Sequence, residues 1–389
     1  MENAALYVPG ADVAGTDVAG ADAPGADVPG GGSDRLGWAG TGARLLDGPL
    51  RPLVGVASEL AALTGVPVDL DTELFLRARL AGFAPPGRTS AGGSCRLLRA
   101  ADGWVAVNLA RPDDHACLPA LLNLLGGARE LTDAVAARPA AETVRHAQLL
   151  GVAAAVLASE RHRRAPVHRA LVGPAGEART PDGVRVVDFS ALWAGPLCAR
   201  LLGLAGAEVL KAESATRPDG ARRGNPAFYQ HLHHGHRAVV LDFADPDAMR
   251  AAVAEADVVI EASRPRALRR AGLDAQRFLA ARPGRVWVSI TGYGRDDDRI
   301  AFGDDAAVAG GLVARPSGGR DPAFLGDALA DPVTGLYAAR AAVRSLRDGG
   351  GHLVDVAMAA CAAELAGAGR CLNSPVPGGS TGRGGKCPC

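Results

Sequence analysis

The sequence from residue 183 to residue 372 alternates short runs of β-branched residues with longer stretches rich in Ala and Leu. The runs suit strands, and the stretches between them have the length and apolar spacing of helices. This alternation predicts an α/β domain with a doubly wound, mostly parallel sheet, in which ligands bind beyond the carboxyl ends of the strands. The predicted strands are 184–189, 207–212, 238–242, 257–261, 285–291 and 352–356, and the predicted helices are 196–204, 246–255, 274–281 and 332–347.

The rest of the chain has a different composition. The N-terminal residues repeat a Gly-Ala-Asp theme that is too small and polar to offset the entropy of ordering, and the C-terminal residues are also of low complexity. Between the leader and the α/β domain, an Ala/Leu-rich segment holds one strand pair, 94–98 and 104–109, joined by a turn at Asp102-Gly103. We therefore predict a disordered leader 1–40, a smaller helical α+β domain 41–170, a Pro/Gly-rich linker 171–182, the α/β domain 183–372 and a disordered tail 373–389.

Charge and composition exclude several classes of partner. The 42 basic residues balance the 42 acidic ones, so no global field favours nucleic acid or an anionic membrane surface. No apolar run reaches the ~18 residues that a membrane helix needs, and the N-terminus lacks the order of a signal peptide. The seven cysteines are scattered and odd in number, unlike a disulfide framework. We expect a cytoplasmic protein that acts on small molecules.

The loop after the first predicted strand is a candidate ligand site. Residues 190–196 read Ser-Ala-Leu-Trp-Ala-Gly-Pro, and the following helix opens with Pro196 near its first position. Free backbone N–H groups at a helix start suit a phosphate. No GxGxxG or Walker A pattern is present, so the local pattern leaves two readings open, a nucleotide-binding loop and an ordinary strand-to-helix turn.

A series of motifs extends beyond this loop. The segment 183–213 has, in order, a strand, a loop ending Ala-Gly-Pro, a helix, the sequence Gly-Ala-Glu-Val and a strand ending Lys-Ala-Glu. Three further motifs follow: HRAVVLD at 236–242, ADVVIE at 256–261 and SITGYG at 289–294. In this order the motifs resemble the family III CoA-transferases, the superfamily of formyl-CoA transferase, carnitine CoA-transferase and α-methylacyl-CoA racemase. The resemblance spans about 183–369. It implies a Rossmann-like CoA-binding domain, acyl-CoA and carboxylic acid substrates, no permanently bound cofactor, and a homodimer.

The resemblance also implies a catalytic carboxylate. The sequence DPVTGLYAA at 331–339, followed by GHLVDVAM at 351–358, is similar to the family's nucleophile helix and the strand after it. It assigns the nucleophile to Asp331. Taken locally, Asp before Pro is equally a helix N-cap and first-turn pair, so capping is the structural alternative. Asp327 is the rival nucleophile.

Contacts to CoA follow from the same resemblance. It implies contacts from the first loop, from the segment after the second strand, and from the residues that follow the strand ending at Glu261. Arginine suits phosphate binding and adenine stacking, although an isolated arginine is as readily a solvated surface charge. The residues so assigned are Leu192, Trp193, Ala194, Arg217, Arg222, Arg223, Ala262 and Ser263.

The implied reaction is transfer of CoA from an acyl-CoA thioester to a carboxylic acid through an aspartyl anhydride and an aspartyl-CoA thioester. Racemases of the family use a His–Asp pair, and the corresponding stretch 302–306, Phe-Gly-Asp-Asp-Ala, has no histidine. Acyl-CoA racemase or isomerase is therefore the second hypothesis. A catalytically inactive CoA-binding protein is the third hypothesis, suggested by the shortened C-terminal end and the leader. The segment 100–114 also resembles the Asp-Gly-Trp strand turn of the family's small domain, here placed first. The histidine-rich stretch 231–236 has no second ligand cluster, so no metal site is predicted.

Overall fold

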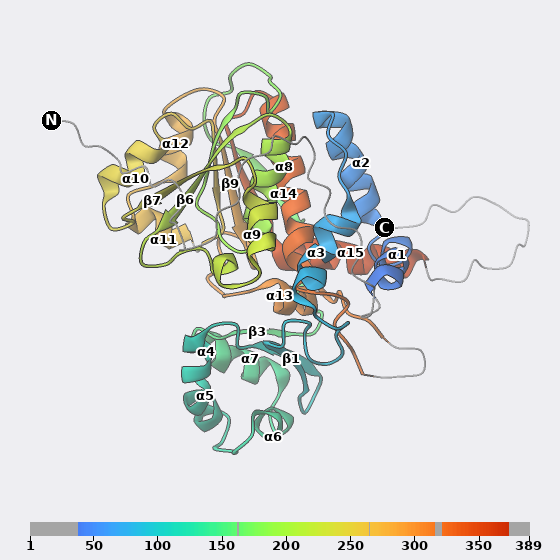
Figure 1. Ribbon diagram of the computed structural model, residues 1–389. Coiled ribbons are helices and arrows are strands. Elements are labelled where there is room, and N and C mark those ends of the chain that lie inside the picture. Colours follow the sequence, from blue (N-terminus) through green and yellow to red (C-terminus); the bar gives the residue numbers. More distant parts are fainter. Residues whose placement is uncertain (1–37, 162, 264, 316–320, 373–389) are drawn as a thin grey trace, which may run out of the picture.

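A seven-stranded sheet forms the centre of the computed structural model, which describes residues 38–161, 163–263, 265–315 and 321–372 (Figure 1). Its strands are β4 (Val167–Leu171), β5 (Arg185–Asp188), β6 (Glu208–Ser214), β7 (Arg237–Leu241), β8 (Val258–Glu261), β9 (Val286–Thr291) and β10 (His352–Ala357). They lie in the order β4-β10-β9-β8-β5-β6-β7, and every neighbouring pair is parallel except β4 with β10. The predicted α/β class and all six predicted strands are confirmed.

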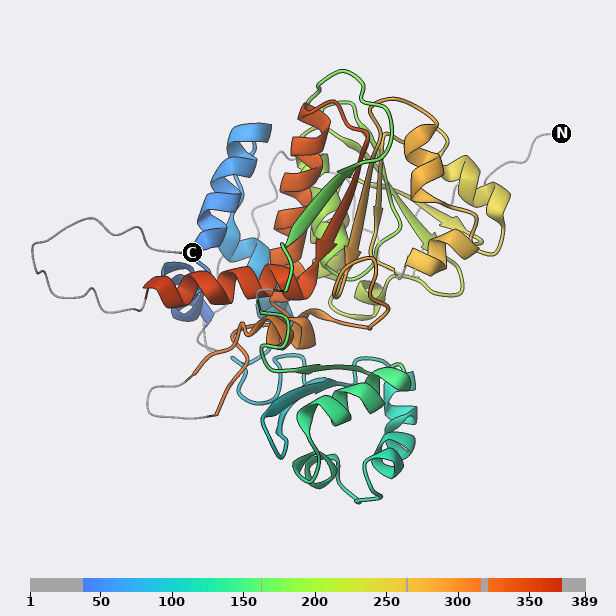
Figure 2. The same ribbon diagram turned by 180° about the vertical axis from the view of Figure 1, so that it is seen from behind.

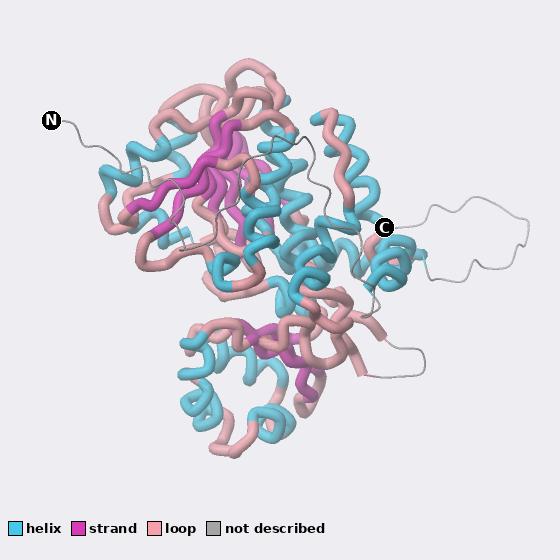
Figure 3. Tube along the Cα trace, viewed as in Figure 1, coloured by secondary structure: helices cyan, strands magenta, loops and turns pink. Residues whose placement is uncertain are grey.

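Helices cover both faces of this sheet because its strands are apolar on both sides. Val186 and Val258 point into a core that they share with helices of one face, whereas the next residues along the strands, Val187 and Val259, point into a second core on the other face. The first face carries α8 (Ala194–Leu204), α9 (Pro226–His233), α14 (Ala330–Arg347) and α15 (Met358–Leu372); the second carries α10 (Pro246–Val253), α11 (Pro265–Arg270) and α12 (Ala275–Ala280). Figure 3 shows the strands between these layers. The four predicted helices are confirmed.

The first helices of the described chain pack on the large sheet rather than in a separate small domain. These are α1 (Trp38–Asp47), α2 (Pro52–Thr64) and α3 (Leu70–Ala81). Leu53 and Leu60 of α2 are buried in the same core as Val333 and Leu336 of α14. β4 also belongs to the large sheet, directly before the predicted linker. The packing therefore differs from the predicted extent 41–170 of the small domain, because an apolar helix face does not reveal which surface will cover it.

A smaller unit lies below the large sheet (Figure 2). Its antiparallel strands are β1 (Cys95–Arg99), β2 (Trp104–Asn108) and β3 (Ala153–Val156), and its helices are α4 (Pro112–Ala116), α5 (Leu118–Leu124), α6 (Leu131–Ala136) and α7 (Ala140–Leu149). The predicted hairpin is confirmed by the pairing of β1 with β2. Val105 and Val107 face the helices of the unit, whereas Leu97 and Ala106 pack with Val308 of α13 (Gly303–Gly310). Helix α13 thus joins the two units.

The predicted leader 1–40 lies almost wholly outside the described residues, and the predicted tail 373–389 lies entirely outside them. Among the described residues, no helix combines the length and the apolar character that a membrane crossing requires.

Candidate active site

The order of the strands predicts where a ligand would bind. From β5 the chain continues outward to β6 and β7, and it then returns to β8 on the other side of β5. Such a reversal leaves a crevice at the carboxyl ends of the two strands that flank it. The loop 189–193 follows β5, residues 262 and 263 follow β8, and the Phe189 N–H donates to the Ile260 carbonyl at 2.9 Å. The predicted CoA-contact residues Leu192, Ala262 and Ser263 therefore lie at one edge of the sheet.

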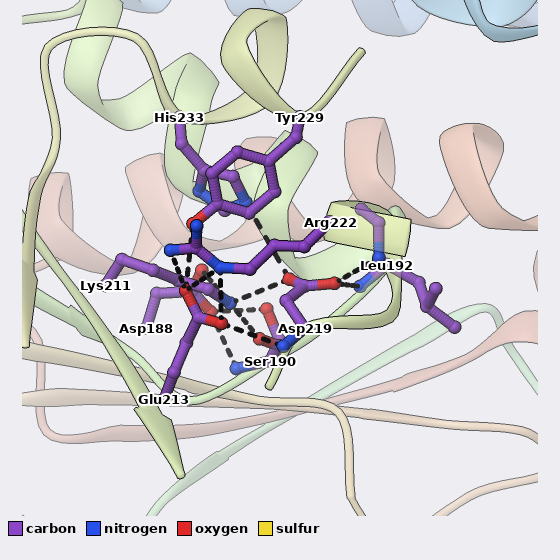
Figure 4. A network of polar contacts seen from close by, with 10 residues as sticks. Asp188, Ser190, Leu192, Lys211, Glu213, Asp219, Arg222, Tyr229 and His233 are labelled. Atoms are coloured by element: carbon purple, nitrogen blue, oxygen red, sulfur yellow. Dashed lines mark hydrogen bonds and ion pairs between the residues drawn. The ribbon is translucent and has the colours of Figure 1, made fainter. Parts of the chain in front are cut away.

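A buried network fixes the shape of the loop after β5 (Figure 4). Lys211 of β6 is fully buried, and its Nζ lies 3.5 Å from an oxygen of Asp188 and 3.2 Å from an oxygen of Asp219. The other Asp219 oxygen accepts hydrogen bonds from the N–H groups of Leu192, at 2.8 Å, and Ala221, at 2.9 Å. Leu192 has a φ of 69°, in the left-handed region that a branched side chain disfavours. The Asp219 carboxylate holds it there.

Asp219 is ionised in this network. Burial alone would raise its pKa, but the nearby His233 and Lys211 and the two backbone N–H groups outweigh burial and lower the pKa well below its ordinary value. Lys211 therefore neutralises a buried carboxylate, and the loop conformation depends on an ion pair that solvent does not reach.

The predicted CoA residues of the first loop differ in their exposure. Leu192 is 41% exposed, whereas the side chains of Trp193 and Ala194 are buried. Trp193 packs edge-on against Phe228, with 5.3 Å between the ring centroids. Its indole fills the core, so residues 193 and 194 could contribute only backbone groups to a ligand.

The three predicted arginines also differ. Arg222 donates to Glu213, with 2.8 Å between Nη2 and Oε1, and its guanidinium lies 4.2 Å from the Tyr229 ring centroid. Arg217 and Arg223 are exposed and form no ion pair with any described residue. Arg222 and Arg223 belong to the 3-10 turn η1 (Gly220–Arg223). This turn lies against Leu192, since a Cβ added at Gly220 would be 2.7 Å from a Leu192 methyl carbon. These two arginines and the first loop are brought together, and Arg217 lies just before the turn in the chain.

Asp331 is the second residue of α14, which begins at Ala330. The N-cap position is held by Leu329, and the Asp331 carboxylate accepts no hydrogen bond from any described residue. The capping alternative is therefore wrong. The carboxylate lies directly against Gly303 at the start of α13, since a Cβ added there would be 2.4 Å from its Oδ2 atom. Asp331 keeps partial contact with solvent.

Three further carboxylates surround Asp331. Asp304 accepts a hydrogen bond from the Ala328 N–H at 3.0 Å, and Asp305 accepts one from the Asn108 side chain at 3.0 Å. Asp327 is 1% exposed. One oxygen each of Asp305 and Asp327 is buried without a hydrogen-bond partner in the described chain. The unpaired Asp305 oxygen suits a protonated carboxyl better than a carboxylate, because an unpaired buried charge is costly, whereas Asp327 is ion-paired with Arg77.

The pKa values of the cluster agree with that interpretation. Burial raises the pKa of Asp331 to about 7; Arg77 lowers it in part, and the neighbouring acids raise it further. Burial likewise raises the pKa of Asp304 and of Asp305 to about 7, and it raises that of Asp327. Carboxyl groups this close titrate as a coupled set, so near neutral pH the cluster holds protons that isolated aspartates would have lost.

A cation that sequence reasoning missed, Arg77, contacts the cluster. Arg77 of α3 donates from Nη1 to Asp327 Oδ1 at 2.8 Å. Its guanidinium carbon lies 5.4 Å from the Trp193 ring centroid and 5.7 Å from that of Phe83. Arg77 therefore joins the loop after β5 to the segment that leads into α14. No local signal marks it, because Arg77 and Asp327 are 250 residues apart.

The histidine-rich stretch belongs to α9 and the turn after it. His231 contacts Glu73 of α3, with 3.1 Å between Nε2 and Oε2, and His233 is buried beside Asp219 and the Tyr229 ring. In the ranges that the structure describes, no group of three or more His, Cys, Asp or Glu side chains is arranged to hold a metal ion.

The structure is an α/β protein whose mostly parallel sheet reverses its strand order between β5 and β8, with a cluster of carboxyl groups around the start of α14. Residues 182–385 match CoA-transferase family III, and the chain belongs to that family. It is 30% identical over 203 residues to the succinate–glutarate CoA-transferase of Agrobacterium fabrum, covering 46% of this chain and 50% of that protein. It is also 30% identical over 199 residues to the formyl-CoA:oxalate CoA-transferase of Afipia carboxidovorans, covering 46% and 47%.

Among solved structures, a CAIB/BAIF family protein from Brucella suis is similar, with a TM-score of 0.43 and 30% identity over 48% of this chain and 55% of that chain. The chain spans about half the length of the curated relatives that it matches.

Proposed function

We propose that the protein transfers CoA between an acyl-CoA thioester and a carboxylic acid, with Asp331 as the nucleophile. The observation that carries the proposal is the state of the Asp331 carboxylate. It heads a long helix at the carboxyl edge of the sheet, caps no backbone N–H of the described chain, and keeps partial contact with solvent. Family membership supplies the reaction class.

In the proposed reaction, an Asp331 oxygen attacks the thioester carbonyl, and the C–S bond breaks to release CoA as a thiolate. The product is a mixed anhydride between Asp331 and the acyl group. The CoA thiolate then attacks the aspartyl carbonyl of the anhydride, which releases the first carboxylic acid and leaves an aspartyl-CoA thioester. The acceptor carboxylate attacks that thioester, and return of the CoA thiolate to the new acyl group frees Asp331.

The environment of Asp331 suits this sequence better than that of Asp327. Asp327 is 1% exposed and its carboxylate is held by Arg77 at 2.8 Å, so an incoming thioester would have to displace an ion pair. Asp331 is free of hydrogen-bond partners in the described chain, and its raised pKa makes its carboxylate more basic than that of an ordinary aspartate. Anhydrides hydrolyse readily, so the proposed mechanism requires the bound CoA and acyl group to shield the partly exposed Asp331 from water.

The proposed CoA site lies at the carboxyl ends of β5 and β8, where the strand order reverses. The supporting residues are the exposed Leu192, the exposed arginines Arg217 and Arg223, and Ala262 with Ser263 after β8. Arginines at this edge would pair with CoA phosphates. For Trp193 and Ala194 the proposed contact is through backbone groups only. We also propose a homodimer, which light scattering on the purified chain would test.

The test is to trap the covalent intermediate. Succinyl-CoA is incubated with the protein, the mixture is treated with hydroxylamine or quenched directly, and peptide mass spectrometry locates the adduct. We expect modification at Asp331, loss of the adduct and of CoA transfer to labelled glutarate in Asp331→Ala, and retention of the adduct in Asp327→Ala. An adduct that survives in Asp331→Ala would refute the assignment. A folded protein that forms no adduct with a panel of acyl-CoA donors would instead support an inactive CoA-binding protein.

One observation favours a second reaction. Racemisation at the α-carbon needs a second acid where relatives use histidine, and Asp304, whose pKa is raised to about 7, lies in the same cluster as Asp331. Exchange of the α-proton for deuterium in 2-methylacyl-CoA, with no transfer of CoA, would identify this activity. Exchange that is lost in both Asp331→Asn and Asp304→Asn would assign the pair.

A further inference from the structure

Arg77 is placed to act on a substrate as well as on the fold. The helix that carries it, α3, precedes the part of the chain that matches the family, yet its guanidinium reaches the acidic cluster and contacts Asp327 at 2.8 Å. The side chain remains 33% exposed. A cation that is anchored at one nitrogen and still reached by solvent at a proposed active site has capacity for a second anion.

The hydrogen-bonding capacity of Arg77 is largely unused. A guanidinium has several N–H donors in a rigid fork, and only the Nη1 bond to Asp327 uses one within the described chain. The rings of Trp193 and Phe83 lie near the guanidinium and restrict its position without accepting conventional hydrogen bonds. The remaining donors match the geometry of a carboxylate, which arginine binds with two parallel hydrogen bonds.

The positive charge of Arg77 is placed at the cluster of aspartates that includes the proposed nucleophile. Arg77 lowers the pKa values of Asp331, Asp304 and Asp327, so its positive charge acts on most of the cluster. An acceptor that brings a second negative charge needs a positive partner to enter. Arg77 pairs with Asp327, and no hydrogen bond or ion pair joins it to Asp331 within the described chain.

We propose that Arg77 binds the non-reacting carboxylate of a dicarboxylic acid acceptor while the other carboxylate reacts at Asp331. Arg77 is then a specificity-determining residue that selects dicarboxylates over monocarboxylates of the same length. This inference rests on the proposed CoA-transferase function, because it concerns the second substrate of that reaction. It assigns a substrate role to the N-terminal part of the chain.

The test compares glutarate with valerate, which has the same number of carbons and a methyl group in place of one carboxylate. Succinyl-CoA first loads the enzyme, and kcat/KM for discharge by each acid is then measured. The wild type should prefer glutarate, and in Arg77→Gln the ratio of the two values should fall about 10-fold to 100-fold, the worth of a charge-assisted hydrogen bond. Succinyl-CoA itself carries a free carboxylate, so the amount of loaded enzyme is measured for each variant and the two discharge rates are compared per loaded enzyme.

Two controls separate recognition from structure. Arg79, on the same helix, is also 33% exposed and pairs with Asp71 at 2.8 Å, so Arg79→Gln should leave the ratio unchanged. If Arg77 merely holds Asp327, then Asp327→Asn should collapse the ratio as Arg77→Gln does; if it binds substrate, Asp327→Asn frees a donor and the ratio stays or rises. An unchanged ratio in Arg77→Gln, or an equal collapse in Asp327→Asn, overturns the proposal.

A measurement of glutarate binding tests the Arg77 proposal even if the protein shows no turnover. Calorimetry of glutarate with the full chain saturated with CoA should detect binding that Arg77→Gln weakens about 10-fold or more and Arg79→Gln does not. Equal affinities in the wild type and Arg77→Gln, or no glutarate binding in the wild type, refute the Arg77 site. Failure of the wild type to form an Asp331 adduct refutes the proposed function separately.

Discussion

Replacing Gly303 by Ala should displace the proposed nucleophile. A Cβ at this position would lie 2.3 Å from the Ala328 carbonyl oxygen and 2.4 Å from Asp331 Oδ2, both far inside van der Waals contact. The first of these atoms belongs to the backbone, so α13 and the segment leading into α14 must separate. Overpacking of this kind costs about 1–3 kcal/mol. Because a misplacement of about 1 Å can cost about 100-fold in rate, adduct formation at Asp331 should fall by about that factor.

Helix propensity alone predicts the opposite sign. Gly303 is the first residue of α13 and its φ is not in the left-handed region, so alanine should favour the helix by up to about 1 kcal/mol. Gly55 of α2 is the matched control, because a Cβ there meets no atom within 4 Å. Thermal unfolding followed by circular dichroism should show a lower Tm for Gly303→Ala and an equal or higher Tm for Gly55→Ala. If Gly303→Ala melts no lower than the wild type and loads Asp331 at the wild-type rate, the close approach of these residues is wrong.

Adduct formation should rise with pH through about 7, because burial raises the pKa of Asp331 to about 7 and only the carboxylate attacks. Asp304→Asn should shift this pH–rate profile to lower pH, since the negative charge of Asp304 raises the pKa of Asp331. The same pKa shift makes the free energy of unfolding depend on pH, because the folded state binds the Asp331 proton more tightly than the unfolded state does. The stabilisation from this proton is complete below about pH 4 and is lost as pH rises through about 7. In urea titrations, Asp331→Asn should therefore lose less stability than the wild type over that pH range. Lys211→Met should lower the free energy of unfolding by about 3–5 kcal/mol, because two buried carboxylates lose their cation. Adding Asp219→Asn to Lys211→Met should recover part of that loss in urea unfolding, and no recovery would contradict the ion-pair account.

The elements with strong local periodicity were predictable from the sequence. The strand runs at 184–189 and 257–261 are apolar on both faces, and that pattern is sufficient to predict a buried parallel sheet. The hairpin was predictable because Asp102-Gly103 stands between two apolar runs. β4 was missed because it follows a basic stretch and is only partly buried at the sheet edge, so its sequence carries little alternation.

The site was predictable only in part. The resemblance assigned Asp331 as the nucleophile. The structure places its carboxylate against Gly303, and the catalytic role stays a prediction. Trp193 was assigned to CoA without distinguishing its backbone from its side chain. The side chain packs in the core, because residue order along a loop does not fix which face of the loop turns inward. Arg77 was not predicted, since a lone arginine on a helix usually belongs to a solvated face and its partner is 250 residues away.

The acidic cluster and its partners come from segments that are distant in the chain. They are Arg77 from α3, Asn108 from β2, Asp304 and Asp305 from α13, Asp327 just before α14, and Asp331 in its first turn. Contacts between such distant segments form slowly in folding, because the entropy of closing long loops is lost before the contacts stabilise the chain. The raised pKa of Asp331 has the same origin, since an unfolded chain solvates each carboxyl separately. In a nascent or partly unfolded chain, Asp331 would therefore have the pKa of an ordinary aspartate. Its raised pKa, and with it the proposed nucleophile, would appear only when all of these segments have folded together.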